Sequence, residues 1–329
     1  MNKRRYTIFT VLALAAVLVA PVQSIYAVND AAGQALEIAP PVLTLSANPG
    51  DTVNAQIDLR NISNSPLIVS STVNDFSAKG ENGDPNINLQ ETTPSPYSIR
   101  AWLQALPQLN LKSKEMQKLP IVIKVPSNAA PGGYYGIIRF SATAPSTSQT
   151  GVSLSASLGS LVFVRVNGDA NENMKIESFY TSEPGRDTPA SLFESTPIDF
   201  VFRINNTGNV YEQPVGQVAV TDMFGRDVAN VNMNLERRTV LPGSIRKFTA
   251  PLDTGALGTT TLFGKYTAKI TIKYGAKNQT VTSTLTFWIV PYRLIIVIIV
   301  GLILLFFIIR TLIRNYNRRI TKRVRTSRR

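Results

Sequence analysis

The sequence predicts an all-β protein with two tandem immunoglobulin-like β-sandwiches and one C-terminal transmembrane α-helix. Three observations lead to this prediction. The middle of the chain alternates apolar and polar residues with a period of two, turn-forming residues separate the alternating segments, and one long uncharged apolar run lies near the C-terminus. The 329 residues allow about two domains once the two ends are set aside.

Residues 1–27 are typical of a secretory signal peptide. Basic residues at positions 3–5 precede the apolar run 8–20, and Ala27 is a small residue suited to cleavage. The alternative is an uncleaved signal anchor, although an apolar run of about 13 residues is short for a bilayer crossing. We expect cleavage after Ala27 and a short linker over residues 28–35.

Residues 36–167 are expected to form the first β-sandwich. Val53, Ala55, Ile57 and Leu59 alternate with polar residues, which places one face of a strand on a core. The same alternation runs through 119–125, 134–140 and 158–166. Clusters of Asn, Pro, Gly and Asp between these segments indicate turns.

The last of these segments, 158–166, has apolar residues on both sides. Leu161, Phe163 and Arg165 face opposite to the valines at positions 162, 164 and 166. We interpret the segment as the last strand of the first domain.

Residues 168–173 are polar and are expected to link the domains, and 174–290 are expected to form the second sandwich. Ile198, Phe200, Phe202 and Ile204 alternate as in the first domain, and further strands are expected within 174–179, 215–222, 246–251, 266–274 and 281–288. The two units resemble each other. The segment starting at Ile57 parallels the one starting at Ile198, 141 residues later, and the Pro-Gly-Gly-Tyr segment at 131–134 parallels 264–266, roughly 132 residues later.

Residues 291–310 are predicted to cross a membrane, because the run 294–309 is uncharged and long enough with its flanks to span about 30 Å as a helix. The alternative is the core helix of a soluble protein. Four residues flanking the run are expected to anchor it at the membrane interfaces. They are Trp288, Tyr292, Arg293 and Arg310.

The tail, 311–329, is strongly basic. Together with Arg310 it carries nine basic residues and no acidic one. The positive-inside rule therefore places the C-terminus in the cytoplasm and the large N-terminal part outside a single-pass cell-membrane anchor. The tail acts as a stop-transfer signal in this interpretation, and binding to anionic lipid headgroups is the alternative.

The net charge of +13 does not indicate nucleic-acid binding. Residues 3–5, Arg293 and the segment 310–329 account for all thirteen charges, so the body between the ends is formally neutral. The chain also has no Cys and no His. This excludes disulfides, thiolate zinc sites and His-dependent catalysis.

Residues 36–142 resemble the first domain of the WxL-interacting envelope proteins of Gram-positive bacteria. The resemblance rests on the order of several pieces. First, Pro40-Pro41-Val42 opens a strand that reaches Pro49-Gly50-Asp51, and the next strand ends at Asn61. Trp102 then follows an extended segment. Finally, the strand that ends at Pro126 is followed by Ala130-Pro131-Gly132-Gly133-Tyr134-Tyr135-Gly136. The order of signal peptide, two β-domains, helix and basic tail is also similar.

This resemblance implies that the first domain associates with peptidoglycan and that the second binds a host or partner protein. The second domain departs from the family pattern at 206–210, 241–244 and 263–266, where it looks more like a general bacterial immunoglobulin-like module. The resemblance therefore covers the first domain, and no binding residues are carried over.

Three aromatic residues of the first domain are candidate ligand contacts. Trp102 could stack on a sugar ring, whereas its neighbours Ile99 and Leu103 favour packing in the core. Tyr134 and Tyr135 could form a binding loop, and a hairpin turn whose tyrosines alternate across the sheet is the other interpretation.

A polar segment of the first domain contains Asp75, Glu81, Asp84 and Glu91, and oxygen-rich loops can hold calcium. The spacing does not match the twelve-residue calcium loop. We expect a solvated surface loop, no metal and no cofactor.

Together these features predict a non-enzymatic, membrane-anchored binding or scaffold protein of the cell envelope. Its partners would be the lipid bilayer and peptidoglycan or other surface proteins, without nucleic acid. Two alternatives remain. A chaperone-like module for secreted subunits also uses paired immunoglobulin-like domains and strand addition, although the anchor argues against it. A wall hydrolase would need two carboxylates about 5 to 9.5 Å apart across a cleft, and no cleft-forming insertion is evident.

Overall fold

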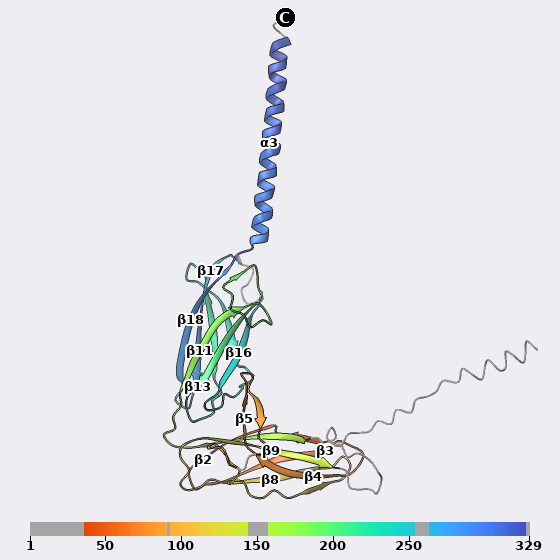
Figure 1. Cartoon of the computed structure of the whole chain (residues 1–329), viewed down its shortest axis with the longest axis vertical. Helices are drawn as coiled ribbons and strands as arrows, with labels where there is room; N and C mark the ends of the chain where they lie inside the picture. Colours follow the sequence, from red (N-terminus) through yellow and green to blue (C-terminus); the bar gives the residue numbers. More distant parts are fainter. Residues whose placement is uncertain (1–35, 91–92, 144–156, 254–262, 327–329) are drawn as a thin grey trace, which may run out of the picture.

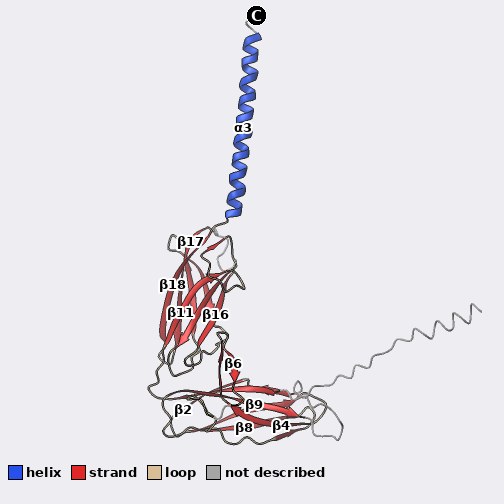
Figure 2. Ribbon diagram, in the orientation of Figure 1, coloured by secondary structure: helices blue, strands red, loops and turns tan. Residues whose placement is uncertain are grey.

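The computed structural model describes residues 36–90, 93–143, 157–253 and 263–326, so the predicted signal peptide and linker lie outside the described residues. The predicted fold class is confirmed. Two β-sandwiches lie crosswise to each other, and one long helix continues from the end of the second sandwich that is far from the first (Figures 1 and 2).

Domain 1, residues 36–166, is a sandwich of a three-stranded sheet, β1-β3-β8, and a five-stranded sheet, β2-β10-β9-β4-β7, with the separate hairpin β5-β6. The strand bounds are β1 Leu36–Ala39, β2 Val42–Ala47, β3 Thr52–Asn61, β4 Leu67–Asn74, β5 Phe76–Lys79, β6 Asp84–Ile87, β7 Leu109–Leu111, β8 Met116–Lys124, β9 Gly132–Thr143 and β10 Ser157–Val166.

Domain 2, residues 174–289, combines the sheets β11-β13-β16 and β12-β18-β17-β14-β15. The strand bounds are β11 Met174–Ser182, β12 Leu192–Phe193, β13 Ile198–Asn206, β14 Val215–Thr221, β15 Asp227–Met233, β16 Ile245–Leu252, β17 Gly264–Tyr274 and β18 Gln279–Ile289. The strands β12 and β15 were not expected from the sequence, and β12, with two residues, is too short to show an alternation.

The two domains have the same strand order, so the expected internal repeat is real, although part of its register was predicted wrongly. β9 and β17 begin at Gly132 and Gly264, 132 residues apart, as predicted. β3 and β13, however, both end in a fully buried asparagine, Asn61 and Asn206, which are 145 residues apart and not 141. A shift of four residues keeps every side chain on the same face of a strand, so alternation alone could not fix this register.

Asn61 and Asn206 hold the same network in the two domains. Each side-chain amide donates to the backbone carbonyl four residues later, at 2.7 Å in both domains. Each donates again to a distant backbone carbonyl, that of Lys112 at 2.9 Å and that of Val240 at 3.0 Å. Each Oδ1 accepts from the backbone N–H two residues later, at 2.9 and 3.0 Å. The asparagine thus satisfies loop polar groups that would otherwise be buried without partners.

Each sandwich buries the apolar face that the alternation predicts. Ile198, Phe200, Phe202 and Ile204 are fully buried in the core of domain 2. In domain 1 Ile57 and Leu59 are fully buried in the corresponding core, with Val53 and Ala55 partly buried against it. The valines at 162, 164 and 166 lie in the same core.

The helix, α3 Tyr292–Thr326, is longer than the predicted span of 291–310. Its apolar part, Tyr292–Arg314, is long enough to cross a membrane, and no part of it is buried against the domains. The helix continues past Arg310 because Arg, Lys and Leu favour helix and no Gly or Pro interrupts the described tail.

Candidate functional site

Two of the predicted ligand contacts, Trp102 and Tyr134, pack on each other inside domain 1. Trp102 is 9% exposed, and the centroids of the two rings lie 4.4 Å apart. The Tyr134 hydroxyl donates to the backbone carbonyl of Ala130 at 3.1 Å. Trp102 therefore packs in the core, as its neighbours Ile99 and Leu103 indicated, and Tyr134 packs against it.

Tyr135, the third predicted contact, lies between the two domains. It is 5% exposed, its ring stacks on Tyr97 at 5.7 Å, and burial raises its pKa above the ordinary value. It belongs to a buried cluster, called here the junction cluster, that joins domain 1 to domain 2. Its members are Phe76, Tyr135, Ile137 and Phe163 of domain 1 with Tyr211 and Leu241 of domain 2.

The Pro-Gly-Gly turn at 131–133 is part of the same junction. The Gly133 N–H donates to the backbone carbonyl of Asn209 at 2.9 Å, and the Asn209 side chain donates to the carbonyl of Pro131 at 3.0 Å. A Cβ on Gly133 would lie 2.8 Å from the backbone nitrogen of Tyr211, so only glycine allows this approach. The sequence indicated the turn but not that domain 2 sits on it.

The acid-rich segment after β4 also reaches domain 2, as the β5-β6 hairpin. Arg203 donates to the Glu81 carboxylate at 2.7 Å, and the Lys247 N–H donates to the Glu81 backbone carbonyl at 2.8 Å. The prediction of a solvated loop is thus wrong for Glu81 and for Asp75, which is 3% exposed and accepts from Ser98. Within the described ranges no group of three acidic residues could hold a metal ion, and Glu91 lies outside those ranges.

The pKa values of two carboxylates beside the junction are shifted in opposite directions. Glu212 is 5% exposed, and burial raises its pKa to about 7, although one oxygen accepts from the Gly275 N–H at 2.9 Å. Burial also acts on Glu172, but hydrogen bonds from Arg165 and the Ala276 N–H outweigh it and hold its pKa below the ordinary value. The Arg165–Glu172 ion pair connects β10 to the segment that links the domains.

The predicted interface anchors lie around the start of α3 and along it. Trp288 and Tyr292 are about half exposed, at 47% and 44%. Arg293 lies over the Tyr292 ring and pairs with Glu194 at 3.2 Å. Arg310 is exposed on the helix.

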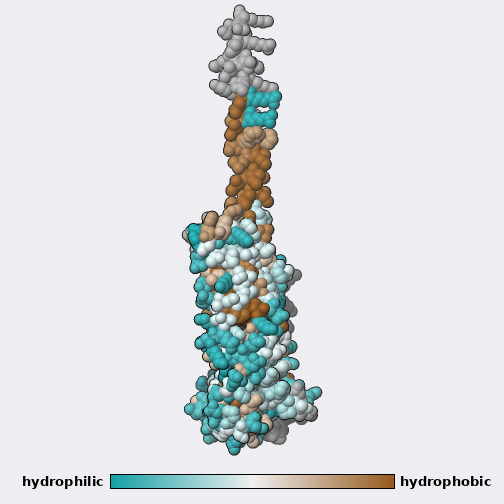
Figure 3. Space-filling view, turned by 90° about the vertical axis from the view of Figure 1, so that its left-hand side faces the viewer, coloured by the Kyte–Doolittle hydropathy of each residue, from teal (hydrophilic) through white to brown (hydrophobic). Residues whose placement is uncertain are grey.

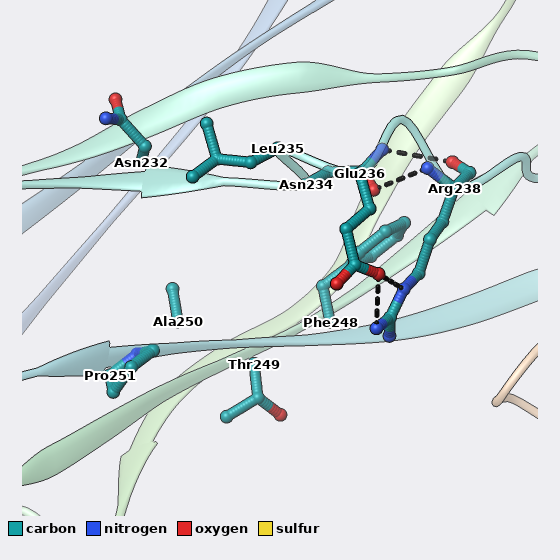
Figure 4. A pocket seen from close by; sticks show the side chains of 9 residues that line it. All are labelled: Asn232, Asn234, Leu235, Glu236, Arg238, Phe248, Thr249, Ala250 and Pro251. Atoms are coloured by element: carbon teal, nitrogen blue, oxygen red, sulfur yellow. Dashed lines mark hydrogen bonds and ion pairs between the residues drawn. The ribbon is translucent and has the colours of Figure 1, made fainter.

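The open edge of domain 2 offers a groove, called here the edge groove, between β15 and β16. Both are edge strands of their sheets, and the hollow between them has a volume of about 220 Å³. Figure 4 shows Glu236 and Arg238 paired at one end and Pro251 on the opposite strand. The lining residues are Asn232, Asn234, Leu235, Glu236, Arg238, Phe248, Thr249, Ala250 and Pro251.

A loop of residues 234–238 holds the groove open. Asn234 has a positive φ of 50°, and its side chain accepts from the Arg238 N–H at 2.7 Å and donates to the Pro214 carbonyl at 2.6 Å. Leu235 at the tip is 78% exposed. Neither alternation nor a turn motif indicated this loop, because its shape depends on the side-chain hydrogen bonds of Asn234.

A second hollow of about 430 Å³ adjoins the first on the other side of the same loop and extends over β14 and β17. The two hollows share Asn232, Asn234 and Leu235. The first is smaller than the roughly 300–1,000 Å³ of typical small-molecule pockets. Two adjoining shallow hollows along an edge strand fit an extended polypeptide, whose backbone can pair with the outer side of β15.

Comparisons with known proteins leave the family open. No family model and no curated protein sequence matches the chain. Solved structures with similar arrangements include the class 5 fimbriae chaperone CfaA, at 13% identity and a TM-score of 0.40, covering 76% of this chain and 98% of that chain. The E. coli chaperone DraB matches at 14% identity and a TM-score of 0.35, covering 78% of this chain and 96% of that chain. Similarity at this level carries no inference about function.

Proposed function

We propose that this chain is a non-enzymatic, membrane-anchored binding protein of the cell envelope that holds an extended polypeptide segment along the edge groove. The observation that carries the proposal is the edge strand β15, which lies beside two adjoining hollows at the 234–238 loop. Backbone pairing would supply affinity, and the hollows would select side chains.

The apolar helix supports the membrane anchor in this proposal. An 18-residue window of Tyr292–Arg314 has a mean hydropathy of 3.1, and the helix lies outside both domains. The basic residues that follow would keep the C-terminus in the cytoplasm and the two sandwiches outside the cell. The packed junction would then hold domain 1 at a fixed position relative to the membrane.

The resemblance of domain 1 to WxL-interacting proteins adds peptidoglycan as a proposed ligand of that domain. Trp102 and Tyr135 are buried, so binding would need other residues of domain 1. Retention of the full-length protein in detergent by purified sacculi tests this ligand, and loss of binding on removal of the sacculi by muramidase is the control.

Site-directed crosslinking tests the edge groove. The chain has no cysteine, so Leu235→Cys provides a unique attachment point for a photo-crosslinker in intact cells. The matched control is Leu89→Cys on domain 1, because Leu89 is also highly exposed, at 61%. We expect a protein adduct at position 235 and none at 89, and the adduct should disappear when Asn230→Pro blocks the edge of β15. Equal adducts at both positions, or none at 235, would refute the proposal.

A chaperone-like role for secreted subunits is the second candidate, and the unpaired edge of β15 favours it as well, because such chaperones act by strand addition. Deleting residues 291–329 separates the two candidates. An anchored binding protein loses function when it is released from the membrane, whereas a chaperone retains the ability to stabilise its subunit.

A further inference from the structure

The membrane-proximal end of domain 2 carries a set of exposed apolar residues that the proposed function does not use. We call it the apolar rim. Its members are Leu192, Met223, Phe224, Phe263, Trp288 and Tyr292, each between 44% and 73% exposed. Single exposed apolar residues are common on soluble proteins, but a group at one end marks an interaction surface.

Strand register brings these residues to the same end of the domain. Gly264 pairs with Ile289, and Leu192 pairs with Trp288. The β14-β15 hairpin turns beyond Thr221, which pairs with Thr267. Its tip therefore reaches the level of Gly264.

Contacts within the rim confirm this placement of the hairpin. A Cβ added to Gly264 would lie 2.5 Å from the Met223 Cε, so Met223 packs directly on the start of β17. The neighbouring Phe224 is 73% exposed and lies under the guanidinium of Arg226, 5.4 Å from the ring centroid.

The distance from the rim to the helix is short. Only Val290 and Pro291 separate β18 from α3, and two residues span at most roughly 7 Å. The Val290 N–H donates to the Phe193 carbonyl at 2.8 Å, and the Tyr292 N–H donates to the Val290 carbonyl at 2.7 Å, so this connection is itself hydrogen-bonded. If α3 crosses a bilayer, this end of domain 2 lies at the bilayer surface. Figure 3 shows hydrophobic residues beside the base of the helix.

We infer that the apolar rim inserts into the outer leaflet of the same membrane and that the β14-β15 hairpin forms a second attachment point beside α3. The inference rests on the proposed membrane crossing. Aromatic side chains favour the headgroup level, and Lys265 at the same end can extend its ammonium group to a lipid phosphate. Arg226 and Arg293 lie at this end as well, each paired with a carboxylate, Asp222 at 2.6 Å and Glu194 at 3.2 Å. One helix alone leaves the domain able to rotate and tilt, whereas two attachment points fix which way the edge groove faces.

Fluorophore labelling of the full-length protein in phosphatidylcholine–phosphatidylglycerol vesicles tests this inference. Three single-cysteine variants are compared: Phe224→Cys in the rim, Leu235→Cys as a control, and Leu302→Cys in the helix. Leu235 is equally exposed but follows the end of β15 that pairs with Gly216, at the other end of the domain. A label at 224 should show blue-shifted emission and several-fold stronger quenching by doxyl-labelled lipids than a label at 235.

The label at 302 separates the two proposals. If 302 is not quenched, the membrane crossing itself is wrong. If 302 is quenched but 224 behaves like 235, the helix crosses and the rim does not insert. If 224 is blue-shifted but insensitive to doxyl lipids, the rim is covered by protein, and the inference is overturned in the same way.

Discussion

The two domains share one topology but differ in the outer face of the five-stranded sheet. In domain 1, paired positions on β9 and β10 hold Tyr135 and Phe163, which are buried in the junction cluster. The corresponding pair on β17 and β18 of domain 2 is Thr267 and Thr286. On β17 and β18 the rest of that face is Thr and Lys, with Trp288 at one end, and most of it is exposed. An antiparallel sheet can leave one face in water, so the difference shows that domain 1 uses this face to dock on its neighbour, whereas domain 2 leaves it solvated.

The largest effect on stability is expected from Phe163→Ala, which removes a buried aromatic side chain from the docking face of domain 1. Removing a buried aromatic side chain typically costs about 3 to 5 kcal/mol, and here the loss falls on the contact between the domains. We therefore expect lower stability and separate unfolding of the two domains. The matched change in domain 2, Thr286→Ala, should cost less than about 0.5 kcal/mol because the side chain is exposed.

Denaturant unfolding of the full chain in detergent micelles measures both variants. The chain has two tryptophans, so Trp288→Phe leaves Trp102 as a fluorescence reporter of domain 1, while far-ultraviolet circular dichroism follows both domains. In Phe163→Ala the two signals should change at different denaturant concentrations. Coincident transitions with an unchanged midpoint would show that the junction cluster does not couple the domains.

The sequence predicted the inner faces well and the outer face of domain 1 poorly. Alternation predicted that Ile57 and Leu59 face the core, and both are fully buried, because a period of two depends only on local sequence. On β10 the same pattern placed Leu161 and Phe163 opposite to Val162 and Val164, and apolar residues on both sides of a strand indicate that both sides are covered. What covers them depends on contacts more than 40 residues away, such as Tyr211, which local patterns cannot show.

The residues of the candidate site could not be predicted from the sequence for a similar reason. Trp102 and Tyr135 drew attention as aromatic residues, yet their rings serve packing. The edge groove is formed by Asn234 and its bonds to Pro214 and Arg238, and an asparagine in a polar stretch does not stand out before the fold is known.

An intermediate loss of stability is expected from substituting the buried asparagine that the two domains share, Asn61 in domain 1 and Asn206 in domain 2. Asn206→Ala and Asn61→Ala each leave buried backbone carbonyls without donors, which should cost about 2 to 3 kcal/mol in either domain. The control is Asn205→Ala, the neighbouring asparagine, whose weaker bond to Glu177 at 3.4 Å is exposed. Thermal unfolding of the three variants compares them. If only one of the buried asparagines mattered, the shared topology would not reflect a shared network.

The smallest effect concerns pH and compares the two carboxylates beside the junction. The folded-state pKa of Glu212 is about 7 against an ordinary 4.5, so the folded protein binds an additional proton between these values. Stability from this group is therefore highest below about pH 4.5 and falls as the pH rises to about 7. After allowance for solvent screening, the loss should be about 1 to 2 kcal/mol.

Glu212→Gln should remove this dependence and make the protein more stable than the parent at pH 8, by about the same amount, because a buried charge is replaced by a neutral group. Glu172→Gln should act in the opposite sense. The pKa of Glu172 is lowered by Arg165 and the Ala276 N–H, so its stabilisation is present above its ordinary pKa and lost as the pH falls. Denaturant unfolding from pH 4 to pH 8 measures both variants. An unchanged pH profile in Glu212→Gln would mean that water reaches this carboxylate, and the junction would then be more open than its packing indicates.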